Sequence, residues 1–207
     1  MRSLEELLWE AEAAHGHLCA GQVLGVRMAM LGCRMLGIDE PRVGMDRKRL
    51  VTFVEIDRCA TDAIGVVTGC RLGKRALKFR DWGKMAASFV DLGRSASDGV
   101  EAVAGGRAVR VSALESSKER AREMYPHIEG KNAQQMAAYR ELPEEELFRT
   151  EWVRIELNAR EMPGYKSGRI VCAGCGEGIN YDREVVVDGA VLCIGCAFPE
   201  TRYYEPV

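Results

Sequence analysis

The sequence has no long uninterrupted hydrophobic run and no excess of charge of either sign. Its most apolar segment, residues 21–36, is interrupted by Gln22, Arg27 and Arg34, which argues against a membrane span. The first residues, MRSLEELLWEAEAA, carry acidic side chains where a signal peptide needs an apolar stretch. The net charge of −2 indicates no basic surface for nucleic acid or a membrane. We therefore expect a cytoplasmic protein that binds no membrane.

Disulfide bonds are not needed either, although the chain has eight cysteines. Disulfide frameworks are typical of small secreted domains, whereas 207 residues are enough to bury a sizeable core. Cysteines in a cytoplasmic chain more often bind metals or carry out thiol chemistry. The apolar fraction of 47% is ordinary for a folded protein and argues against wholesale disorder.

The hydrophobic patterns predict an α+β core, in which helices pack on a mixed or antiparallel sheet. Helical patterns cover residues 4–15, 20–36 and 60–69. Strand-like patterns cover residues 51–56, 76–82, 84–92, 106–114 and 152–157, with glycine turns that include Gly105–Gly106. A charged helical region over 116–148 is too polar to form a core, so we expect it to pack over the sheet or across a partner subunit.

Small residues recur along one side of the expected helix 20–36. Gly21, Gly25 and Ala29 are spaced four residues apart, which places them on one face. This pattern predicts that another backbone passes close to that face. Cys33 on the same helix is expected to be a small core residue.

Four cysteines near the C-terminus form two Cys-x-x-Cys pairs. The pairs are Cys172 with Cys175 and Cys193 with Cys196, and 17 residues lie between them. This spacing is typical of a structural zinc site, and about forty residues cannot fold alone without a metal or disulfides. We therefore expect a core domain over 1–163 and a treble-clef or ribbon-like zinc finger over 164–207, with a zinc that stabilises the fold and is closed to catalysis.

A second group of metal-binding side chains lies near the N-terminus. The segment HGHLCAG, residues 15–21, contains His15, His17 and Cys19 between two expected helices. Cys59 begins the next expected helix, and a helix N-terminus favours the thiolate. His17, Cys19 and Cys59 are therefore the candidate ligands of a second divalent metal, zinc by preference, and the candidate catalytic residues.

Three further residues are weaker candidates for binding a cofactor at the same place. They are His15, Asp62 and Cys70. Asp62 could orient a ligand imidazole through a hydrogen bond, as carboxylates often do. The spacing does not show whether Cys59 and Cys70 meet the loop in space.

Several segments resemble the FmdE family, named for the E-subunit of formylmethanofuran dehydrogenase. They are HGHLCAGQVLGVRMAMLG from residue 15, RCATDAIGVVTGCRLGK from residue 58 and DWGKMA from residue 81. CGEGI and REVVVDGAVLC resemble the small zinc finger that many members carry. Ala20 departs from the family, which usually has proline there. The resemblance implies an α+β core, a homodimer, and a cleft lined by the histidine–cysteine loop and the cysteine at the strand end.

Three functions stay open at this point. The family is named for an enzyme complex that uses a molybdenum or tungsten pterin, but no segment resembles a pterin-binding catalytic subunit. The resemblance therefore favours an accessory or metal-handling protein with an oxidoreductase partner subunit. An enzyme that uses the same cleft, either metal-dependent or thiol-based, is the second function. The third is a regulator that senses a metal or metabolite and binds nucleic acid or protein through the finger, aided by the basic segment Arg71, Lys74, Arg75 and Lys78.

Overall fold

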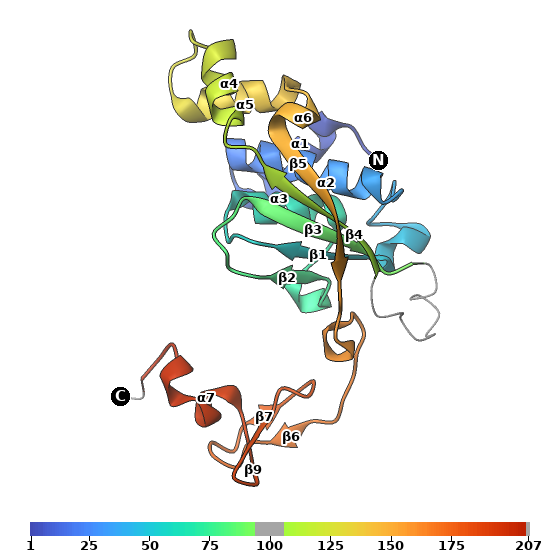
Figure 1. The fold of residues 1–207 in the computed structure, drawn as a ribbon, viewed down its shortest axis with the longest axis vertical. Helices are drawn as coiled ribbons and strands as arrows, with labels where there is room; N and C mark the ends of the chain where they lie inside the picture. The colour runs from blue at the N-terminus through green and yellow to red at the C-terminus, as the bar shows by residue number, and fades with distance from the viewer. Residues whose placement is uncertain (94–105, 206–207) are drawn as a thin grey trace. The chain divides into compact units, whose positions relative to one another are not determined.

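A computed structural model describes residues 1–93 and 106–205 of the chain (Figure 1). Gly105, part of an expected turn, lies outside the described residues. The chain divides into two compact units, Met1–Leu157 and Asn158–Val207. In the described residues, no helix is long and apolar enough to cross a membrane.

A five-stranded sheet organises the first unit, with strand order β2-β1-β3-β4-β5. The strands are β1 (Leu50–Val54), β2 (Leu77–Phe79), β3 (Ala86–Asp91), β4 (Gly106–Ala113) and β5 (Phe148–Ile155). β2 runs parallel to β1, and the remaining neighbours are antiparallel. The expected α+β class with a mixed sheet is confirmed.

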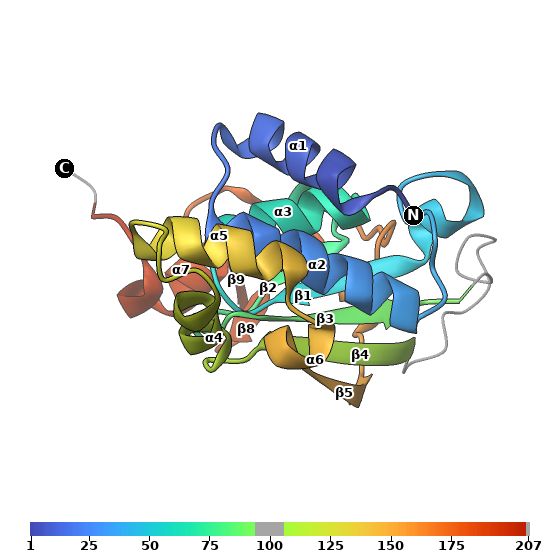
Figure 2. The same cartoon turned by 90° about the horizontal axis from the view of Figure 1, so that it is seen from above.

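Three helices cover one face of this sheet. They are α1 (Leu4–His15), α2 (Ala20–Met35) and α3 (Cys59–Thr68). Figure 2 shows α2 and α3 between α1 and the strands. The core forms where these helices meet the sheet, with Leu7, Val26, Phe89 and Val109 almost fully buried. Ser3 begins α1 with a capping box to Glu6, and Gly16 ends it in the left-handed conformation.

Glycines let α2 approach its neighbours closely, as the small-residue pattern predicts. A Cβ at Gly25 would lie 2.5 Å from the carbonyl oxygen of Ala60 on α3. A Cβ at Gly32 would lie 2.2 Å from the ring of Phe89 on β3. Cys33 on the same helix is fully buried, so its expected role as a core residue is confirmed.

The charged region forms the helices α4 (Ser117–Met124), α5 (Lys131–Glu141) and α6 (Glu144–Leu147). α5 packs on α2, so the expectation that this region lies directly over the sheet is wrong for α5. The reason is a specific anchor, because Arg27 of α2 donates to the backbone oxygens of Tyr139 and Leu142 at 2.7 and 2.6 Å. Figure 2 shows α5 alongside α2.

The second unit consists of two small hairpins and short helices. Its strands are β6 (Ile170–Val171), β7 (Gly178–Ile179), β8 (Val185–Val187) and β9 (Ala190–Leu192), and α7 spans Ile194–Ala197. β8 and β9 join at Asp188 and Gly189, which both have positive φ, as a tight hairpin turn requires. Among its described residues only Cys172 and Ile179 are buried, so apolar packing contributes little to this unit.

Candidate functional site

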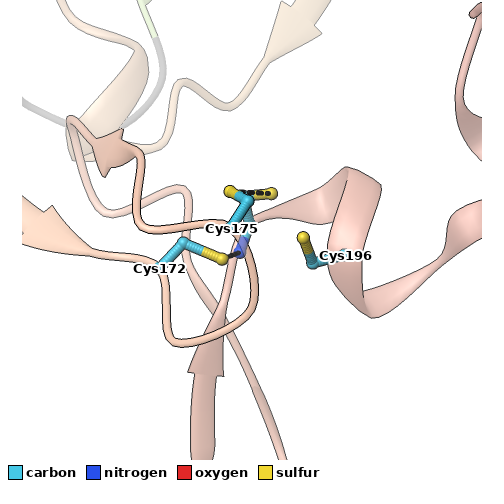
Figure 3. A group of neighbouring side chains, drawn as sticks. Cys172, Cys175 and Cys196 are labelled. Carbon is cyan, nitrogen blue, oxygen red and sulfur yellow. Dashed lines mark hydrogen bonds between the residues drawn. The ribbon is translucent and has the colours of Figure 1, made fainter. Parts of the chain in front are cut away.

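The four C-terminal cysteines converge on one point in the second unit. Cys172 and Cys175 lie around the turn between β6 and β7, Cys193 follows β9, and Cys196 lies on α7 (Figure 3). All four sulfur atoms lie within 4.8 Å of one another, and the sulfurs of Cys175 and Cys193 are 4.0 Å apart. Zn–S bonds of about 2.3 Å in a tetrahedron give sulfur–sulfur distances of about 3.8 Å. The geometry therefore fits a four-thiolate zinc.

Backbone groups prepare this site for charged sulfur. The N–H of Cys193 donates to Sγ of Cys172 at 3.2 Å. This bond and the N–H groups of Cys175 and Gly174 lower the pKa of Cys172 to about 6. Hydrogen bonding by the neighbouring cysteine Cys193 raises the pKa of Cys196 to about 12, because clustered thiols resist ionising together. A bound Zn²⁺ supplies the positive charge that the remaining thiolates need.

The second site builds on the close approach of α2 and α3. Cys19 is the N-cap of α2, and Cys59 is the first residue of α3. A Cβ at Gly21 would lie 3.4 Å from Cβ of Cys59 and 3.7 Å from Sγ of Cys19, so both cysteines flank this glycine. Their thiols form a hydrogen bond with each other. The fold thus brings Cys59 to the histidine–cysteine loop, which the spacing could not show.

The acidity of Cys59 differs from the expectation. We expected the N-terminus of α3 to lower its pKa, but the pKa of Cys59 is raised. Partial burial is the main cause, followed by the hydrogen bond and charge of Cys19. The metal-free Cys59 is therefore a protonated thiol at neutral pH, and the expectation of a ready thiolate is wrong for this state.

Two histidines and a carboxylate lie beside the cysteine pair. Nδ1 of His15 is 2.8 Å from Oδ2 of Asp62, which lies on the first turn of α3. The rings of His15 and His17 have their centroids 4.9 Å apart, and His17 is exposed. Asp62 therefore orients an imidazole by a hydrogen bond, and that imidazole belongs to His15.

The structure does not bring Cys70 to this cleft. Cys70 follows the C-terminus of α3, whereas Cys59 begins that helix, and ten helical residues span about 15 Å. Its side chain is 2% exposed and lies against Thr52 and the backbone oxygen of Leu50. Burial raises the pKa of Cys70, as in a core thiol. Its expected cofactor role fails because the chain turns under β1 after Gly69.

Metal-ligand geometry separates the two sites. Among residues 1–93 and 106–205, the four finger cysteines are the group of three or more ligand atoms within 4.8 Å of one another. The cleft atoms of His17, Cys19 and Cys59 do not form such a group in this conformation. Two thiols in contact are nevertheless the soft donors that zinc prefers.

Asn132 is a cleft residue that the sequence did not indicate. From α5, its Oδ1 accepts a hydrogen bond from the N–H of Ala20 at 3.0 Å. The donor belongs to the first turn of α2, where backbone N–H groups lack partners within the helix. Asn132 thus fixes the residue next to Cys19 from 112 positions away.

Replacing Asn132 with leucine should lower the free energy of unfolding by about 1 kcal/mol, because the N–H of Ala20 loses its acceptor. Asn132→Asp keeps an acceptor oxygen and should retain most of that stability. Urea unfolding followed by circular dichroism measures both. Equal loss in the two variants would contradict the capping role.

Comparisons with known proteins agree with these two units. A family model described as "FmdE, Molybdenum formylmethanofuran dehydrogenase operon" matches residues 14–155. A model for the prokaryotic dksA/traR C4-type zinc finger matches residues 165–202. The fold is similar to the crystal structure of an FmdE-like protein from Syntrophus aciditrophicus, described as belonging to a tungsten formylmethanofuran dehydrogenase. The TM-score is 0.60 at 18% identity, over 97% of this chain and 95% of that one.

A curated relative from Archaeoglobus fulgidus is named "Probable S-adenosyl-L-methionine-binding protein". It is 32% identical over 204 residues, which cover 94% of this chain and 53% of the relative. The chain therefore spans about half the length of that relative.

Proposed function

Since the chain belongs to the FmdE family and carries a four-cysteine zinc finger, we propose that it is a metal-handling accessory protein with a second metal site in its cleft. The observation that carries the proposal is the contact between the thiols of Cys19 and Cys59. Each thiol begins a helix, so two helix dipoles and several free N–H groups face the sulfurs once these ionise.

A divalent metal overcomes the raised pKa of Cys59, because a coordinated thiol loses its proton. Cys19 and Cys59 would supply two thiolates. The exposed ring of His17 can rotate to supply a third ligand. His15, held by Asp62 and next to His17, would limit the positions that this ring takes. Three protein ligands leave the fourth position of zinc open, as metal transfer requires.

The zinc finger supports an accessory role, because it offers a surface for a partner. Large apolar side chains are exposed on it, namely Val171, Val186, Ile194, Phe198, Tyr203 and Tyr204. Exposed apolar surface of this kind is typical of protein interaction sites. The partner that we propose is a component of a molybdenum or tungsten oxidoreductase, the class of enzyme for which the family is named.

Counting bound metal tests the second site. Elemental analysis of zinc-saturated protein should give one metal more in the wild type than in Cys19→Ser or Cys59→Ser, because each variant removes a cleft thiolate. Cys193→Ser should also lose one metal, but from the finger. Cys33→Ala is the matched control, since this buried cysteine contacts neither site.

The contrary result is equally clear. If Cys19→Ser keeps the metal content of the wild type, the cleft holds no metal of its own. A Cys19–Cys59 disulfide in metal-free protein, detected by mass spectrometry after thiol alkylation, would then favour the thiol-based enzyme over the metal-handling protein.

A further inference from the structure

A pocket of about 470 Å³ lies in the first unit, away from both cysteine sites. α1, the turn at Pro41 and Arg42, and the C-terminal end of α3 form its walls. α3 begins at Cys59 and ends near Gly69, so about 15 Å of helix separates this pocket from the cleft. Its volume is in the range of small-molecule sites, which is about 300 to 1,000 Å³.

One wall carries an exposed indole. Trp9 lies on α1, whose buried face consists of Leu7, Leu8 and Ala11. The Trp9 side chain is on the opposite side and is 71% exposed. A tryptophan of this kind offers a flat apolar surface on which a planar ring can stack. Helix packing therefore does not explain this side chain, and a planar ligand would.

The facing wall carries positive charge. Arg42 is held in place, because it donates to Oε2 of Glu10 at 2.6 Å and to the backbone oxygen of Val66 at 3.2 Å. In the described part of the chain, the side chains of Arg71 and Lys74 form no ion pair. Glu10 is already neutralised by Arg42 and Arg2, so the two unpaired cations decide the charge of the pocket.

We propose that this pocket binds a planar heterocycle that carries a phosphate, of the size of a nucleoside monophosphate. The ring stacks on Trp9, and the phosphate lies between Arg71 and Lys74. A guanidinium and an ammonium together match a doubly charged phosphate better than a single carboxylate. The site does not depend on the cleft metal, and it gives a use to the basic segment that follows α3.

Adenosine 5′-monophosphate is a direct probe of this site. Isothermal titration calorimetry of the full chain should show saturable binding, with adenosine and inorganic phosphate each at least about tenfold weaker, because each lacks one half of the recognised group. The double variant R71Q/K74Q should bind the nucleotide at least about tenfold more weakly. Trp9→Ala should weaken it too, and quenching of Trp9 fluorescence should accompany binding.

K118Q/R149Q is the matched control, because it removes the same two charges from α4 and β5. It should bind the nucleotide as the wild type does. Circular dichroism should show all variants folded, since Arg71 and Lys74 are exposed. Absence of nucleotide binding in the wild type, or equal affinity in R71Q/K74Q and the wild type, would overturn the proposal. Equal affinity for adenosine would overturn the role of the phosphate.

Discussion

Replacing Cys193 with serine should release the finger zinc and unfold residues 158–207, while residues 1–157 stay folded. The physical reason is the small apolar core of the second unit. Only Cys172 and Ile179 are buried among its described residues. Structural zinc contributes about 10 to 16 kcal/mol of binding free energy in small fingers, far more than two buried side chains can replace. The two units have separate cores, so the loss should stay local.

Hydrogen exchange read by mass spectrometry tests this expectation segment by segment. In Cys193→Ser, amides of β6 to β9 should exchange as in an unfolded chain, and amides of α2 and β3 should keep their protection. Cys33→Ala should leave the finger protected. Retained protection in the finger of zinc-free Cys193→Ser would show that the metal does not hold this unit together.

Replacing Gly25 with leucine should have the second largest effect. A Cβ at this position would lie 2.5 Å from the oxygen and 2.7 Å from Cα of Ala60, and 2.9 Å from Cβ of Ala63. These are backbone and short side-chain atoms that cannot rotate away. The helices α2 and α3 must move apart, at a cost of about 3 kcal/mol in the free energy of unfolding. Cys19 and Cys59 then separate, so the cleft should lose its metal although every ligand is present.

The matched control is Gly73→Leu, because a Cβ at Gly73 has no atom within 4 Å. Urea unfolding should give a stability near that of the wild type for Gly73→Leu and a clear loss for Gly25→Leu. Elemental analysis should show full metal content in the control alone. Wild-type stability and metal content in Gly25→Leu would contradict the close contact of α2 and α3.

The helices and their close packing were readable from the sequence because their signals are local. Gly16, Gly69 and the spacing of Gly21 and Gly25 predicted where α1 and α3 end and which side of α2 is close to another backbone. The four-cysteine spacing is local as well. The parallel pairing of β2 with β1 was not predicted, because strand direction depends on how the chain returns after α3.

The cleft was predicted only in part, because its members come from distant segments. Residue types indicated His15, His17, Cys19 and Cys59, but nothing in the sequence shows that Cys59 reaches the loop. Cys70 was misplaced because a glycine turn predicts a change of direction without saying where the chain goes. Asn132 has no local pattern, since its partner Ala20 lies 112 positions away.

The central claim, a second metal held by Cys19, Cys59 and His17, is tested most directly by zinc X-ray absorption spectroscopy. The sample is the full chain with Cys172, Cys175, Cys193 and Cys196 all replaced by serine, so that the finger cannot contribute sulfur. We expect one zinc with two sulfur neighbours at about 2.3 Å and nitrogen at about 2.0 Å. The sulfur signal should disappear when Cys59→Ser is added. A sample without bound zinc, or with zinc surrounded by oxygen and nitrogen alone, would contradict the claim.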